Sequence, residues 1–202
     1  MGHLFLDSYQ KKDGIAHKEI IRPKYKWFPF DWFSFDPCTN IYQDPFWYGK
    51  DIVEKVKKCE VPQEIASHFF SHIIFGDMGC SFEAAKSDIE ECIKLAQKIN
   101  IKLETFIFPR NSIGHLEILK EKGFKCYRDI INSWYEKMKI HQVLKKFLRA
   151  SSEFFILSPP VSKVKEDKIG LLSISGSMRF RGNHGIYKFL PIKFRVIRAK
   201  KV

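Results

Sequence analysis

Apolar side chains recur at helical spacing in two segments of the first half of the chain. Residues 50–58 place three apolar side chains on one face, and residues 82–98 carry a longer apolar stripe opposite polar positions. Ser81 precedes the longer pattern as a capping residue, and lysines fall late in both segments, as the helix dipole favours. Both segments are therefore predicted to be helices.

Three short apolar runs are predicted to be strands, at residues 64–70, 102–108 and 124–127. A further helix is expected between the last two runs, with Ser112 as its cap and Gly123 just after its end. The order strand, helix, strand, helix, strand implies right-handed crossovers and a parallel sheet. The predicted fold class is therefore α/β.

The carboxyl ends of the first two predicted strands carry polar groups. His68 and His72 follow the first run, and Pro109, Arg110 and Asn111 follow the second. In open parallel sheets, ligands bind beyond the carboxyl ends of the strands. We therefore expect both groups at one edge of the sheet.

The pattern is weaker outside this central part. Residues 1–24 are polar and poorly patterned, so they are expected to pack loosely, and residues 25–202 are expected to form a single domain. Residues 134–149 have the pattern of a basic amphipathic helix, whereas residues 154–157 and 169–174 have that of strands.

Aromatic residues and prolines crowd together in residues 25–50, which excludes a long helix or a central strand there. Such a segment either packs on a core as a lid or offers flat rings for stacking on sugars. Under the second interpretation, Trp47 and Tyr48 are the candidate substrate-binding residues.

The composition indicates a folded protein. The chain has 202 residues, of which 45% are apolar and 15% aromatic, enough for a sizeable core. No apolar run has the roughly 18 residues of a membrane span, and the first apolar patch is too short for a signal peptide. The five cysteines lack a C-x-x-C spacing and are expected to be free thiols in a reducing compartment. A cytoplasmic location is the resulting expectation.

The formal net charge is +12, which is compatible with nucleic acid, a membrane surface or an anionic substrate as partner. The basic residues are dispersed along the chain rather than gathered in one segment. Dispersed charge is usually solvated surface, so a basic nucleic-acid-associated protein remains the weaker alternative.

The four-residue spacing of His68 and His72 is compatible with a metal site only if the chain curls between them. Along a strand the two side chains would lie roughly 13 Å apart, at ~3.3 Å per residue. On a helical turn their Cβ atoms lie ~5 to 6 Å apart, and both imidazoles can then bind one ion. Phe69 occupies the position of the catalytic Glu in H-E-x-x-H, which excludes that motif. The alternative is a pair of packed, hydrogen-bonded histidines.

Residues 62–72, Pro-Gln-Glu-Ile-Ala-Ser-His-Phe-Phe-Ser-His, resemble the second motif of the polysaccharide deacetylases (NodB homology, carbohydrate esterase family 4). The likeness continues through residues 81–98, the strand ending at 106–111, and residues 117–128, which contain Gly-Phe and then Tyr-Arg. Several motifs in the family's order are more specific than any one of them alone.

The resemblance implies a partial, deformed (β/α) barrel that removes N- or O-acetyl groups from a carbohydrate. It further implies a divalent metal, usually zinc, held by His68 and His72, which polarises the acetyl carbonyl and activates water. The backbone N–H of Arg110 would bind the developing oxyanion, and Pro109 and Asn111 would line the substrate site.

The chain also departs from the family pattern. It has no Asp-Asp pair, which supplies the general base and the third metal ligand, and no counterpart of the C-terminal Leu-His motif. Residues 107–111 read Ile-Phe-Pro-Arg-Asn in place of Arg-Pro-Pro-Tyr-Gly, so Arg110 does not occupy the place of the family's arginine. We therefore expect an incomplete deacetylase-like domain with weak metal binding, possessing little or no activity. The alternative is a non-catalytic carbohydrate-binding relative.

Overall fold

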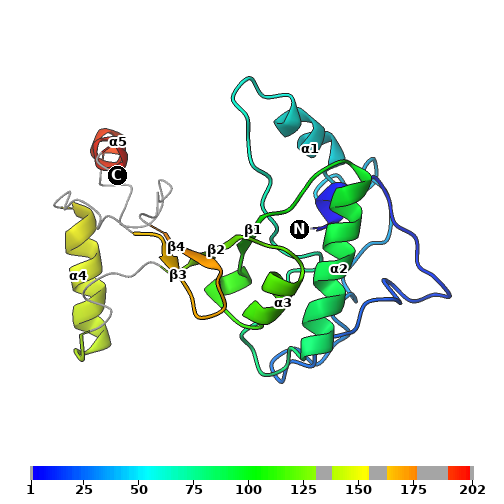
Figure 1. Ribbon diagram of the computed structural model, residues 1–202, viewed down its shortest axis with the longest axis horizontal. Helices are drawn as coiled ribbons and strands as arrows, with labels where there is room; N and C mark the ends of the chain where they lie inside the picture. Colours follow the sequence, from blue (N-terminus) through cyan, green and yellow to red (C-terminus); the bar gives the residue numbers. More distant parts are fainter. Residues whose placement is uncertain (1, 131–137, 155–162, 177–190, 201–202) are drawn as a thin grey trace. The chain divides into compact units, whose positions relative to one another are not determined.

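The computed structural model describes most of the chain (Figure 1), in the ranges 2–130, 138–154, 163–176 and 191–200. The chain divides into two compact units, the first made of Met1–Arg128 with Glu166–Leu172 and the second of Asp129–Lys165 with Ser173–Val202. The described residues form helices and a small open sheet, so the predicted mixture of α and β structure is confirmed.

The first unit contains the helices that the apolar spacing predicts. Its helical elements are the 3-10 turns η1 (Gly2–Phe5) and η2 (Pro109–Asn111) and the α-helices α1 (Lys50–Lys57), α2 (Phe82–Lys98) and α3 (Leu116–Glu121). Helix α2 begins as expected, because the Ser81 hydroxyl accepts a hydrogen bond from the N–H of Ala84 at 3.2 Å. Its apolar stripe faces the core, together with one charged residue, Asp88.

Helix α3 starts later than the sequence predicts. Its N-cap is His115 rather than Ser112, and His115 adopts a left-handed conformation with φ 47°. Ser112 is held away from the helix, because its carbonyl accepts a hydrogen bond from the N–H of Gly76 at 3.2 Å. The predicted end is confirmed, since Gly123 follows the helix with a φ of 82° that glycine adopts without strain.

The described strands form one sheet in the order β1-β2-β4-β3, made of β1 (Thr105–Ile107), β2 (Cys126–Asp129), β3 (Lys165–Glu166) and β4 (Leu172–Ser175). Strands β1 and β2 are parallel, with Phe106 opposite Tyr127, as the predicted crossover requires. The strand predicted at residues 64–70 is reduced to a single parallel bridge between Ser67 and Phe106. The chain turns away immediately after that bridge.

The core of the first unit is rich in phenylalanine. Phe69, Phe70, Phe75 and Phe106 each expose 1% or less of their surface, and the ring of Phe69 meets those of Phe75 and Phe106 edge to face. The apolar faces of α2 and α3 cover this cluster with fully buried residues such as Ile89. The segment around the predicted histidine pair is therefore anchored by its own neighbours in the sequence.

The first residues of the chain are packed more tightly than we expected. Phe5, His17 and Ile20 are buried, at 7%, 1% and 3% exposure, and η1 contacts both α1 and α2. Figure 1 shows this N-terminal turn beside the two helices. Its apolar residues follow no helical or strand period, because they belong to turns that the rest of the unit holds in place.

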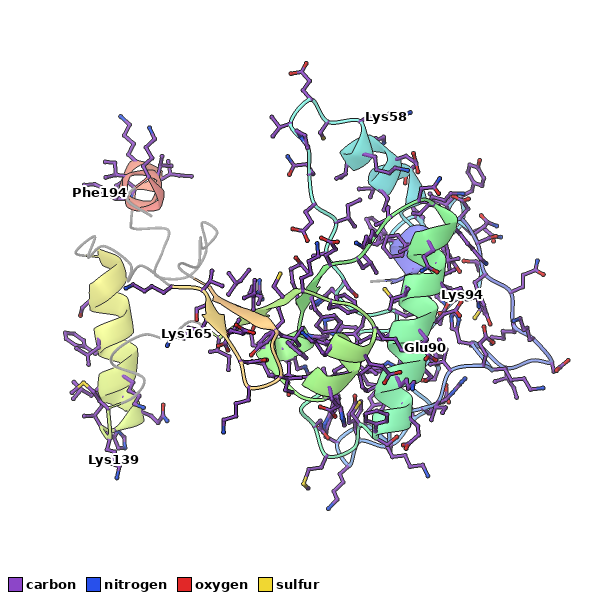
Figure 2. All side chains as sticks on the ribbon, in the orientation of Figure 1. Lys58, Glu90, Lys94, Lys139, Lys165 and Phe194 are labelled. Carbon is purple, nitrogen blue, oxygen red and sulfur yellow. The ribbon has the colours of Figure 1, made fainter. Side chains whose placement is uncertain are left out.

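The second unit contains α4 (Gln142–Phe154) and α5 (Ile192–Ala199). Helix α4 overlaps the predicted basic helix, whereas residues 155–157 of a predicted strand lie outside the described residues. Among the described helices, none is long and apolar enough to cross a membrane. Basic side chains occur in both units, including Lys58, Lys94 and Lys139 (Figure 2), which agrees with a dispersed charge.

Candidate metal centre

His68 and His72 lie next to each other because the chain curls after the Ser67 bridge. Phe69 and His72 both adopt left-handed conformations, with φ of 66° and 65°, so the segment forms a tight bend instead of continuing as a strand. The two imidazole centroids are 4.8 Å apart, and the rings are inclined at 75°. The curl that a shared ion would require is thus present.

A buried carboxylate holds this bend. Asp88, on α2, is fully buried and accepts hydrogen bonds from the N–H of Phe70 at 2.9 Å and from the N–H of Ser71 at 3.1 Å. The Ser71 hydroxyl also donates to Asp88. Burial raises the pKa of Asp88 to about 6, although these hydrogen bonds act in the opposite direction. In the sequence, Asp88 is a lone acidic residue on the apolar stripe of α2, and the pattern does not indicate which groups it binds.

The orientation of His68 is set by the backbone of β1. Its Nδ1 lies 2.8 Å from the carbonyl oxygen of Ile107, and because a carbonyl only accepts, Nδ1 carries the proton and Nε2 keeps a lone pair. Burial lowers the pKa of both His68 and His72, and the positive charge of Arg110 lowers that of His72 further. Both imidazoles are therefore favoured as neutral ligands.

Polar residues at the end of β1 form a rim near this pair. The guanidinium of Arg110 lies over the ring of Trp27, 4.8 Å from its centroid, and the indole N–H of Trp27 donates to Asp77 at 3.0 Å. Asn111 accepts a hydrogen bond from Arg128 at 3.1 Å. Because Ile107 bonds to His68 and leads directly into this turn, the two polar groups do lie at one edge.

Of the other predicted binding residues, Pro109 and Tyr48 are buried, whereas Trp47 is 38% exposed. Tyr48 is 1% exposed, and its hydroxyl accepts the N–H of Thr39 at 2.9 Å. The rings of Trp47 and Tyr48 lie 5.8 and 6.4 Å from that of His3, beside a second cluster of titratable groups.

The second cluster consists of His3, His17 and Asp36, which come from three separate turns. Oδ2 of Asp36 lies 2.6 Å from Nε2 of His3 and 2.8 Å from Nε2 of His17, and the two Nε2 atoms are 3.3 Å apart. The three residues are 6%, 1% and 6% exposed. This group could hold a metal ion. No motif in the sequence indicated it, because its members are 14 to 33 positions apart.

Neighbouring groups orient each member of this cluster. Oδ1 of Asp36 accepts the N–H of Cys38 at 2.9 Å, which turns Oδ2 toward the histidines. The ring of Tyr9 stacks on that of His17 at 3.8 Å, and its hydroxyl accepts the His17 N–H. Burial raises the pKa of Asp36, but hydrogen bonds from His17, His3 and the Cys38 N–H outweigh it and hold that pKa below its ordinary value.

The two clusters offer different sets of donors. Within the described ranges, His3, His17 and Asp36 are the one group of three or more metal-binding side chains, so His68 and His72 have no third partner there. Two imidazoles without a carboxylate make an incomplete site for a divalent ion.

The chain matches no protein-family model, no curated protein and no solved structure.

Proposed function

We propose that the chain is a metal-dependent hydrolase of the polysaccharide deacetylase type, with a (β/α)-barrel architecture, acting on acetyl groups of a carbohydrate. The observation that supports it is the distance of 4.8 Å between the imidazole centroids of His68 and His72, just after the bridge between Ser67 and Phe106. The proton on Nδ1 of His68 leaves Nε2 as the ligand atom, an arrangement common among metal-binding histidines. The turn at Pro109–Asn111, beside the pair, is the part of the chain proposed to meet the acetyl group.

In this proposal His68 and His72 would hold a zinc ion, which would supply polarisation of the acetyl carbonyl and a lowered pKa of a water molecule. The chain's own contribution is to hold two neutral imidazoles and to present Arg110 and Asn111 at the edge where the substrate would lie. The described residues supply no carboxylate as third ligand to this pair. We therefore expect weak metal affinity and slow or absent acetyl release.

Metal content and acetate release test the proposal. The untagged full chain would be titrated with Zn²⁺ after chelation, and acetate released from a chitin oligomer would be measured in parallel. His68→Ala and His72→Ala should each abolish a weak equivalent of zinc and any acetate release. His141→Ala, which changes an exposed histidine of the second unit, is the matched control. A weak equivalent of zinc that survives both substitutions of the pair would contradict the assignment.

A non-catalytic carbohydrate-binding protein is the second candidate, and exposed aromatic rings favour it. Trp27, Phe30 and Phe35 expose 47%, 63% and 68% of their surface and form a connected group through Phe28. Flat exposed rings can stack on sugars. Sugar binding that survives chelation and His72→Ala, but falls with Trp27→Ala, would support this candidate over the hydrolase.

A further inference from the structure

The buried cluster of His3, His17 and Asp36 has a geometry that goes beyond the proposed function. Three side chains from different turns direct one ligand atom each toward a common point, at mutual distances of 2.6, 2.8 and 3.3 Å. Atoms bound to one ion at ~2.0 to 2.2 Å lie ~3 Å apart across a right angle and ~3.3 to 3.6 Å apart across a tetrahedral angle. The Nε2–Nε2 distance already fits, and the two contacts to Oδ2 need only a small lengthening.

We infer that His3, His17 and Asp36 form a buried site for a divalent transition-metal ion, separate from the His68 and His72 pair. Two imidazoles and one carboxylate are the donor set of many zinc and non-haem iron sites. Magnesium and calcium prefer oxygen donors, so they fit this site poorly.

The surroundings of the cluster favour an ion over hydrogen bonding alone. The carboxylate of Asp36 lies in an interior position, where a divalent cation would offset its negative charge. Cys38 holds Oδ1, and Tyr9 fixes the backbone and ring of His17, so the ligand atoms are oriented before any ion arrives. The ring of Phe70 stacks on His3 at 4.6 Å and closes the site with an apolar wall.

The ion would have a structural role. His3 lies in the short turn η1, and His17 and Asp36 lie in segments with little regular structure. A single ion would join three such segments, and metal binding to groups that are dispersed in the unfolded chain adds directly to folding stability. We therefore expect the N-terminal part of the first unit to become more stable when the ion is bound.

The test uses the full untagged chain, stripped with a chelator and titrated separately with Zn²⁺ and Co²⁺. Bound metal per chain, the visible absorption of Co²⁺ and the midpoint of thermal unfolding would be recorded. We expect one tight equivalent that raises the unfolding midpoint. Asp36→Asn and His3→Gln should each weaken that equivalent by ~10-fold or more and abolish the thermal shift. His72→Ala and His141→Ala should leave it intact.

The inference would be overturned by a stripped chain that takes up no tight equivalent, or by a tight equivalent that survives Asp36→Asn. If Asp36→Asn fails to fold by circular dichroism, His3→Gln gives the same reading, because His3 belongs to a four-residue turn at the start of the chain. A tight equivalent lost with His72→Ala and kept in His3→Gln would also overturn it. If His72→Ala loses only a weak equivalent of zinc, that result bears on the proposed hydrolase site and not on the site formed by His3, His17 and Asp36.

Discussion

The two histidine clusters of the first unit differ in how the chain brings them together. His68 and His72 are half-buried neighbours on one bend, whereas His3, His17 and Asp36 are buried and come from three distant turns. The local pair was recognisable in the sequence from its spacing but offers two donors. The distant trio left no sequence motif, yet it has the complete set of two imidazoles and a carboxylate. A recognisable spacing and a complete donor set are therefore separate properties.

The clusters nevertheless share a wall of the core. Phe70 lies between the two histidines of the pair in the sequence, and its ring stacks on His3 of the trio. Its N–H is held by Asp88, which also binds Ser71. A substitution at Asp88 should consequently disturb both clusters, whereas a substitution away from Asp88 should affect one cluster and leave the other unchanged.

The largest effect is expected from Asp88→Ala. The substitution leaves two buried N–H groups and one hydroxyl without their acceptor, and each unsatisfied buried group costs ~1 to 3 kcal/mol. Urea denaturation should show a loss of roughly 3 kcal/mol or more. The control is Lys94→Ala on the same helix, where an exposed ion pair with Glu91 (Figure 2 labels Lys94) should contribute less than ~1 kcal/mol. Equal losses in the two variants would show that Asp88 does not hold the bend.

Asp88→Asn should change the dependence of stability on pH. Because the folded pKa is raised from 3.8 to about 6, protonated Asp88 is favoured in the fold. The contribution of the raised pKa to the free energy of unfolding is full below about pH 3.8 and is lost as the pH rises through about 6. The difference in unfolding free energy between wild type and Asp88→Asn should change by up to about 3 kcal/mol over that interval. A difference independent of pH would contradict the raised pKa. The pKa of Asp36 is lowered instead, so its contribution to stability is lost as the pH falls.

Gly114→Ala should disturb the pair and spare the trio. An added Cβ would lie 2.6 Å from the carbonyl oxygen of Phe75, so the turn that leads from Asn111 to α3 would have to move away from residues 75–76. We expect a loss of about 2 kcal/mol by thermal or urea unfolding, together with weaker zinc binding by the pair. In the control Gly123→Ala no atom lies within 4 Å of the new Cβ, so backbone strain alone acts. Unchanged stability in Gly114→Ala would mean that this close approach is absent in solution.

The smallest effect is expected from Trp27→Ala. The substitution removes the stacking of Arg110 and the hydrogen bond to Asp77 at a partly exposed position. Stability should fall by ~1 kcal/mol or less, and tight metal uptake should be unchanged. Retention on a carbohydrate resin should fall if the exposed rings bind sugars. Phe30→Ala, at a neighbouring exposed ring, tests whether any loss is specific to the rim.

Much of the helical structure was predictable, and the failures have local causes. The apolar stripe and the Ser81 cap correctly located α2, and Gly123 correctly located the end of α3. Ser112 was wrong as a cap, because its carbonyl is bound to Gly76, a contact that no local pattern encodes. The predicted strand at residues 64–70 was too long, since Asp88 pulls the chain into a bend after Ser67.

The candidate site was also predictable only where local patterns indicate it. His68, His72 and Arg110 were recognised because their spacing places them after strands. Tyr48 was expected to face a sugar, but the structure buries it beside the trio. Burial depends on which segments pack together. The composition of residues 25–50 therefore could not show which aromatic rings pack on the core and which are exposed for stacking.

The sequence by itself determined the amphipathic helices and the parallel pairing of β1 with β2, because each depends on neighbours within a few residues or on a short crossover. Only the tertiary structure decided that Asp88 bends that segment and that His3, His17 and Asp36 meet. Those contacts join residues up to 33 positions apart. A buried carboxylate is costly unless hydrogen bonds satisfy it, and the donors come from whichever segments pack around it, which is a property of the packed chain rather than of any stretch within it.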